Sequence, residues 1–439
     1  MLHYHRYTLP NGLRLLVHED HSTPMAAVAV QYDVGSRDED PARTGFAHLF
    51  EHLMFGGSAN APSYDDPLQL AGGENNAFTN TDLTCFYVSL PAPNLETALW
   101  LEADRMAQLT INEHALEVQR RVVVEEFKET CLNEPYGDAW HHLSALAYRR
   151  HPYRWPTIGL EPAHIEEASL DDVRAFYGRH YHPGNAILAV AGAVRAEAVY
   201  RQVLRLFGEL PARQTPERSL TTEPDFLPAG GSPTDGDSPP PPRKVYARVA
   251  VDAVYLAYPM PGRVAEDFFA LDLLTDVLAE GASSRLYRTL VKERGLATTI
   301  DAYVTGTADP GLVVVEGKPR DGVTCEQLHA AIEEQLAALR ETPVPAIELE
   351  KVKNKLASSM AFSELSVTNK AINLCFYAGI GDVELINTEE DIYQALTPAQ
   401  LQAAAARYFG PAQCRALYYR SSGEGGERLP LALAGELAE

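Results

Sequence analysis

The chain has 439 residues, of which 46% are apolar, so it can bury a sizeable core and should divide into two or more domains. Its formal net charge of −23 argues against a nucleic-acid partner, because binding to phosphates relies on clustered Lys and Arg. The five cysteines are odd in number and lack CxxC spacing, so they predict neither a disulfide framework nor a thiolate zinc site.

The sequence also argues against a membrane protein. It has no stretch of about 18 uncharged apolar residues, and its N-terminal segment lacks a basic region followed by an apolar one. We therefore expect a cytoplasmic protein without membrane association.

The first half alternates strand-type and helix-type sequence. Apolar or alternating runs at 13–20 and 25–36 predict strands, and helical spacing follows from Thr44 to Phe55. Another strand-type run covers 75–90. Helical stretches are then expected around 93–108, 112–131 and 134–149, before a last strand at 185–194.

A segment rich in Pro, Gly, Ser and Asp separates the two halves, and its composition predicts a linker at 211–246. The second half loosely repeats the order of the first. Strand-type runs lie at 254–260, 298–304 and 311–319, with helices through 265–281 and from Thr324 onward. We expect an α+β fold of two homologous domains, 1–210 and 247–439, each a mainly antiparallel sheet with helices packed on one face.

The segment "GFAHLFEHLMFGGS" carries the clearest chemical signal. His48 and His52 are four residues apart, so on a helix they project from one face and can share a metal ion. Glu51 precedes His52 and is placed to act as a general base on a metal-activated water. A polar helical stripe is the alternative interpretation, and the HxxEH pattern alone does not decide between the two.

The pattern is the inverted zinc motif of the inverzincins. Together with "LPNGLRLLV", "GGENNAFTNTDLTCFYVSL", "RRVVVEEFKE" and "RHYHPGNAILAVAG", it resembles the pitrilysin and mitochondrial processing peptidase family of zinc peptidases. The five blocks span most of the first half in order, and "SSRLYRTLVKERGLATTI" extends the resemblance weakly into the second half. The resemblance implies one zinc ion per chain and a chamber that admits unfolded peptides.

The resemblance also implies a third zinc ligand, a glutamate whose position in "RRVVVEE" is Glu126. Helical spacing turns Glu125 away by about 100° but leaves Glu129 on the same face as Glu126, so Glu129 stays an alternative. Gln119 stands where the family often has an acidic residue, which removes a negative charge from the surroundings of the metal.

The run "NNAFTN" resembles the strand with which family members pair the substrate backbone, although an edge strand with a polar end is the plainer interpretation. The candidate substrate contacts are Asn76, Ala77, Phe78 and Thr79. The amide of Asn76 is suited to hold the scissile carbonyl or the leaving amine.

These residues predict a zinc metalloendopeptidase in which Glu51 is the catalytic base and His48, His52 and Glu126 are the ligands. A structural subunit of the same fold without turnover is the main alternative. A zinc-dependent module that binds peptides without cleaving them is the other.

The second half lacks two donor residues that the resemblance leads us to expect. Complete family members have an arginine and, seven residues later, a tyrosine that reach the substrate, and the matching positions here are Val291 and Thr298. Neither side chain can replace the missing donors. We therefore expect a homologous zinc-free partner subunit that supplies the Arg/Tyr pair, with a homodimer as the alternative.

Overall fold

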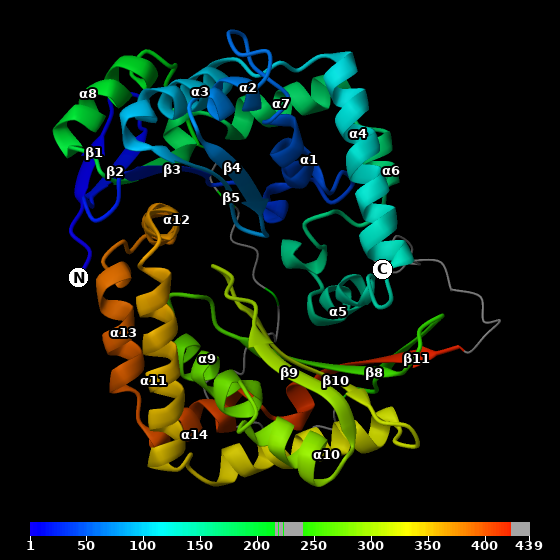
Figure 1. The fold of residues 1–439 in the computed structure, drawn as a ribbon. Coiled ribbons are helices and arrows are strands. Elements are labelled where there is room, and N and C mark those ends of the chain that lie inside the picture. The colour runs from blue at the N-terminus through cyan, green and yellow to red at the C-terminus, as the bar shows by residue number, and fades with distance from the viewer. Residues whose placement is uncertain (216–217, 219–222, 224–239, 423–439) are drawn as a thin grey trace. The chain divides into compact units, whose positions relative to one another are not determined.

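A computed structural model of the chain describes residues 1–215, 218, 223 and 240–422. The contacts divide the chain into two compact units (Figure 1). Unit 1 comprises Met1–Lys128, Trp155–Leu220 and Ser359–Glu389, and unit 2 comprises Glu129–Arg154, Thr221–Ser358 and Glu390–Glu439. Each unit thus includes one segment from the other half of the chain, which a division at the linker does not provide for.

Unit 1 is built on a six-stranded sheet with the order β1-β2-β6-β3-β5-β4. The strands are β1 (His5–Thr8), β2 (Arg14–Glu19), β3 (Met25–Tyr32), β4 (Glu74–Thr79), β5 (Thr84–Pro91) and β6 (Ala186–Gly192). All neighbours are antiparallel except β2 and β6. This confirms the mainly antiparallel sheet expected from the sequence.

One face of this sheet carries the main core of unit 1. Val28 and Val30 alternate along β3 with alanines, so their side chains share one face and join the buried cluster. The helices of unit 1 include α1 (Phe46–Leu53), α2 (Asp65–Leu70), α3 (Leu95–Ala107), α4 (Glu113–Phe127), α6 (Ala163–Glu166), α7 (Leu170–His180) and α8 (Ala196–Phe207). Phe50 of α1 is fully buried in this core, which fixes the helix that carries the histidines.

The other face of the same sheet is covered by α12 (Val367–Gly379), as Figure 1 shows beside β3. The thiol of Cys375 lies 3.5 Å from the backbone carbonyls of both Ala29 and Ile187. A side chain at Gly379 would collide with Gln31, since an added Cβ would lie 2.1 Å from its amide nitrogen. Small residues therefore let this helix pack closely on the strands.

Unit 2 contains a five-stranded sheet with the order β7-β11-β8-β10-β9. The strands are β7 (Arg243–Ala247), β8 (Ala253–Met260), β9 (Ala297–Val304), β10 (Gly311–Pro319) and β11 (Arg415–Ser421). Only β7 and β11 are parallel. The linker was predicted to end at residue 246, but Arg243 to Tyr246 belong to β7. Their side chains alternate in exposure, and their backbone pairs with β11. Residues 216–217, 219–222 and 224–239 of that linker lie outside the described residues.

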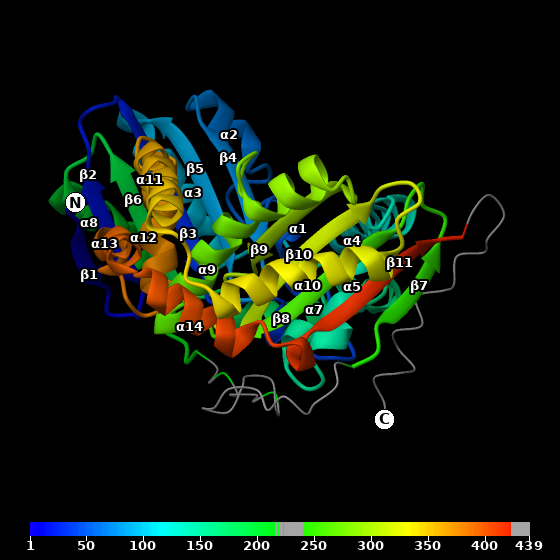
Figure 2. The same ribbon diagram turned by 90° about the horizontal axis from the view of Figure 1, so that it is seen from below.

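Figure 2 shows the helices of unit 2 along its sheet, among them α9 (Glu266–Ala279), α10 (Cys325–Glu341) and α14 (Pro398–Tyr408). Helix α5 (Ala139–Ala147) covers the other face, where Leu143 packs with Leu312 and Leu417. The helices α11 (Ala346–Ser363) and α13 (Leu385–Ala395) each include residues of both units. None of the helices in the described part of the chain is both long enough and apolar enough to cross a membrane.

Candidate metal centre

Helix α1 presents its polar face through His48, Glu51 and His52, while its apolar face is buried in the core of unit 1. The helix begins after Gly45, whose φ of 91° is the left-handed conformation that favours glycine. A Cβ at this position would lie 2.8 Å from the carbonyl oxygen of Ile158, so only glycine fits. The backbone conformation of Gly45 therefore fixes where the helix with the two histidines begins.

A buried carboxylate, which the sequence analysis did not single out, holds the same helix end. Glu39 accepts hydrogen bonds from the backbone amides of Gly45 at 2.9 Å and Ala47 at 2.8 Å. Burial raises the pKa of Glu39 to about 8, although these two hydrogen bonds act in the opposite direction. An acidic side chain suits a helix N-terminus, but Glu39 lies too far before the helix for a capping pattern to reveal it.

Helix α4 brings Glu126 to the two histidines. The Nε2 atoms of His48 and His52 are 3.3 Å apart. The carboxylate of Glu126 lies 3.7 Å from Nε2 of His48 and 3.3 Å from Nε2 of His52. Glu125 instead pairs with Lys128 at 2.7 Å. Two imidazole nitrogens and a carboxylate thus lie together, with one donor atom from each residue within 4.8 Å of the other two.

The donor group fits zinc in both chemistry and spacing. Two imidazoles and one carboxylate are a typical catalytic zinc set, and ligands about 2.0–2.1 Å from a tetrahedral ion are separated by about 3.3 Å. Burial, and to a smaller extent the charge of His52, lowers the pKa of His48 to about 4, so His48 is neutral at pH 7. A neutral imidazole is the form that binds a metal ion. These residues could therefore hold a zinc ion.

Glu51 is held from the neighbouring strand. The hydroxyl of Thr79, at the end of β4, donates a hydrogen bond of 2.5 Å to the carboxylate of Glu51. Thr79 is one of the predicted substrate contacts, and its hydroxyl also contacts the candidate base. The hydrogen bond connects α1 to the edge of the sheet.

The other candidate substrate contacts lie on β4 at the end of the sheet, and the outer edge of this strand pairs with no strand in the described part of the chain. The side chain of Asn76 accepts a hydrogen bond of 2.8 Å from the backbone amide of Ala77. Phe78 is 37% exposed, and its ring centroid lies 6.4 Å from that of Tyr87. This strand therefore offers open backbone groups beside the residue that contacts Glu51.

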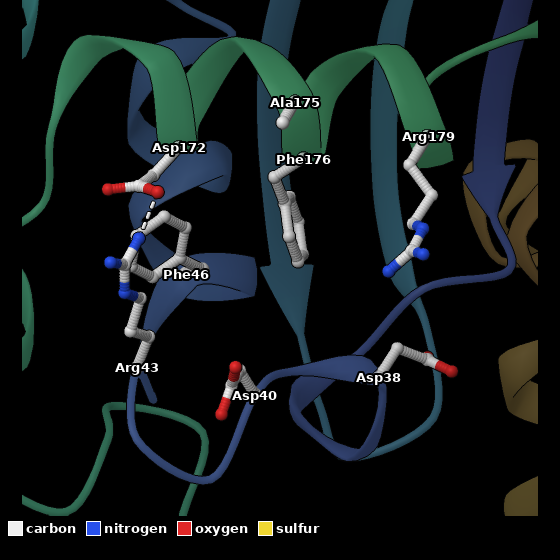
Figure 3. A pocket seen from close by; sticks show the side chains of 8 residues that line it. All are labelled: Asp38, Asp40, Arg43, Phe46, Asp172, Ala175, Phe176 and Arg179. Carbon is white, nitrogen blue, oxygen red and sulfur yellow. Dashed lines mark ion pairs between the residues drawn. The ribbon is translucent and has the colours of Figure 1, made fainter.

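A separate pocket of unit 1, about 400 Å³ in volume, lies between α1, α7 and the segment before α1 (Figure 3). Phe46 of α1 packs on Phe176 with ring centroids 5.8 Å apart, and Arg43 pairs with Asp172 at the rim. The pocket's lining includes none of the predicted site residues. We interpret its lining residues as packing that supports α1.

Comparison with known proteins gives this geometry a family context. Residues 14–160 match the family described as insulinase (peptidase family M16), and residues 167–356 match the peptidase M16 inactive domain. The zinc protease PqqE of Helicobacter pylori is 28% identical over 420 residues, covering 94% of this chain and 92% of that protein. An uncharacterized zinc protease of Mycobacterium leprae is 31% identical over 327 residues, covering 71% of this chain and 68% of that protein.

A solved structure agrees with these sequence matches. The crystal structure of a protease from Helicobacter pylori is similar with a TM-score of 0.87 at 27% identity, covering 96% of this chain and all of that one. The chain therefore belongs to peptidase family M16, the insulinase and pitrilysin type whose relatives are named zinc proteases.

Proposed function

We propose that this chain is a zinc-dependent endopeptidase that hydrolyses unfolded peptides or small polypeptides. The observation that carries the proposal is the convergence of His48, His52 and Glu126, with Glu51 next to His52 on the same helix. The names of the sequence relatives support the same activity. We expect one zinc ion at this centre.

The proposed mechanism uses a water molecule rather than a covalent intermediate. A zinc ion held by the three donors would lower the pKa of that water and polarise the substrate carbonyl. Glu51 accepts the proton from the water as it attacks and returns the proton to the leaving amine. Thr79 orients the carboxylate of Glu51 during these transfers.

We infer that the substrate binds as an added strand along β4, through Asn76, Ala77, Phe78 and Thr79. The open outer edge of β4 supports this, because its backbone groups can pair with a peptide of almost any sequence. Unfolded peptides suit such an edge, since folded proteins have their backbone groups already paired.

A non-catalytic subunit of the same fold is the second candidate function. The match of residues 167–356 to a domain described as inactive favours it for that part of the chain. Digestion of a peptide mixture, read by mass spectrometry, separates the candidates. An endopeptidase yields internal cuts that Glu51→Gln removes, whereas a structural or peptide-binding subunit yields none.

We further propose that a homologous zinc-free subunit completes the site with an arginine and a tyrosine. At the matching positions here, Val291 packs against the core of unit 2, and Thr298 donates its hydroxyl to the carbonyl of Lys318 at 3.1 Å. Neither side chain is a substitute for a cationic or phenolic donor at the substrate. A homodimer is the alternative assembly.

A further inference from the structure

Unit 2 holds a second cluster of metal-type donors, formed by His329, Glu333 and Cys414. One donor atom from each lies within 4.8 Å of the other two. His329 and Glu333 are one turn apart on α10, and Cys414 directly precedes β11. The cluster therefore joins α10 to the residue that precedes β11.

The imidazole of His329 is oriented by a neighbour. Its Nδ1 atom is hydrogen-bonded to the hydroxyl of Tyr418 at 2.8 Å. The Nε2 atom lies 3.9 Å from Oε1 of Glu333. A metal-binding histidine has the same arrangement, with one ring nitrogen held by a hydrogen bond and the other directed at the ion.

The two oxygens of the Glu333 carboxylate differ in their hydrogen bonding. The hydroxyl of Tyr258 donates to Oε1, whereas Oε2 is buried and has no hydrogen-bond partner among the described residues. Arg340 lies 3.6 Å from Oε2 as an ion pair, which offsets part of the charge that a cation would meet. Oε2 thus has a charged neighbour but no hydrogen bond, which is uncommon for a buried oxygen and leaves it able to bind a cation.

Burial divides the cluster into an inner and an outer part. Cys414 is only 3% exposed. The side chains of His329 and Glu333 are 19% and 20% exposed, so an ion from solvent can reach them. The sulfur atom therefore belongs to the least exposed of the three residues.

We propose that unit 2 binds one transition-metal ion of the zinc type through His329 Nε2, Glu333 and Cys414 Sγ. Imidazole, thiolate and carboxylate together suit zinc and similar divalent transition metals, whereas magnesium and calcium avoid sulfur ligands. On binding, a metal–sulfur bond replaces the S–H bond of Cys414, and the proton leaves to solvent. The donors must move closer together and the charge of Arg340 opposes the ion, so this site binds more weakly than the centre on α1.

The test uses the full chain with His48→Ala and His52→Ala, which removes two donors of the first centre. Titration with Co²⁺, a spectroscopic substitute for zinc, should produce a thiolate-to-cobalt absorption band that saturates at one ion per chain. Cys414→Ser should abolish the band. Cys325→Ser, at the start of α10 but outside the cluster, is the matched control and should keep it.

A second variant guards against a folding failure of Cys414→Ser. Glu333→Gln should keep the thiolate band but weaken Co²⁺ binding at least ~10-fold. Even the loss of a residue that only contacts a metal ligand typically lowers metal affinity by this factor. A band that persists in Cys414→Ser, or no band in the double-histidine background, would overturn the proposal. Peptidase activity does not enter this readout, so the result is independent of the proposed function.

Discussion

Thr79 donates its hydroxyl hydrogen to the carboxylate of Glu51 across the junction of β4 and α1. Removing this hydrogen bond with Thr79→Val should lower kcat for peptide cleavage by ~10-fold or more, because a hydrogen bond to a charged group contributes about 1.5–3 kcal/mol. Zinc content should not change. Thr79→Ser retains the hydroxyl and is the control, and equal loss in both variants would contradict an orienting role.

Glu126 and Glu125 provide a matched pair of substitutions on α4. Glu126→Ala should empty the zinc site, because it removes one of the three donors, whereas Glu125→Ala loses only an exposed pair with Lys128. Metal analysis of the purified variants gives the stoichiometry. Full zinc in Glu126→Ala combined with loss in Glu129→Ala would assign the third ligand to Glu129.

Glu39 should stabilise the helix that carries the histidines. Glu39→Ala leaves the buried amides of Gly45 and Ala47 without acceptors, and each unsatisfied buried group costs about 1–3 kcal/mol. We expect a lower midpoint of thermal unfolding and weaker zinc binding. Glu39→Gln keeps one acceptor oxygen and should lose less, so a larger loss in Glu39→Gln than in Glu39→Ala would argue against the capping role.

The pair of Asp20 and Lys370 should make unit 1 sensitive to acid. Lys370, on α12, donates to Asp20 at 2.6 Å, and this hydrogen bond holds the pKa of Asp20 well below its usual range. A depressed pKa stabilises the fold above the unfolded-state pKa of about 3.9. That contribution is lost as the pH falls below this value.

Denaturant unfolding of Asp20→Asn measures this contribution. The variant should be less stable by about 1.5–3 kcal/mol at pH 7, on the scale of a charge-assisted hydrogen bond, and should lose less stability than the wild type below pH ~4. Parallel stability curves at all pH values would show that the pair does not titrate with unfolding.

The purified chain should cleave peptides weakly if a partner completes its site. We expect turnover below ~1 s⁻¹, the lower end of the ordinary enzyme range, and an increase on addition of a homologous zinc-free chain. Turnover of ~1 s⁻¹ or more that no such chain changes would favour a self-sufficient monomer or a homodimer.

The sequence predicted the position of α1 and most of the strands, because the 3.6-residue spacing and the alternating runs are local signals. It did not predict β1, β7 or β11. It also selected three donors that the structure brings together, although Glu126 lies on a different helix from the histidines. Glu39 and the contact of Thr79 with Glu51 depend on tertiary packing, which leaves no local pattern. The exchange of α5 and α12 between the halves is likewise fixed by long-range burial rather than by propensity.

The central claim is that Glu51 is the base beside a zinc ion held by His48, His52 and Glu126. Glu51→Gln keeps the size of the side chain but removes the proton acceptor. The direct test measures zinc content and the cleavage rate of an unstructured peptide for this variant and the wild type, each with any partner that the wild type requires. The account predicts equal zinc content and a rate reduced by ~10² or more, whereas an undiminished rate with full zinc would contradict it.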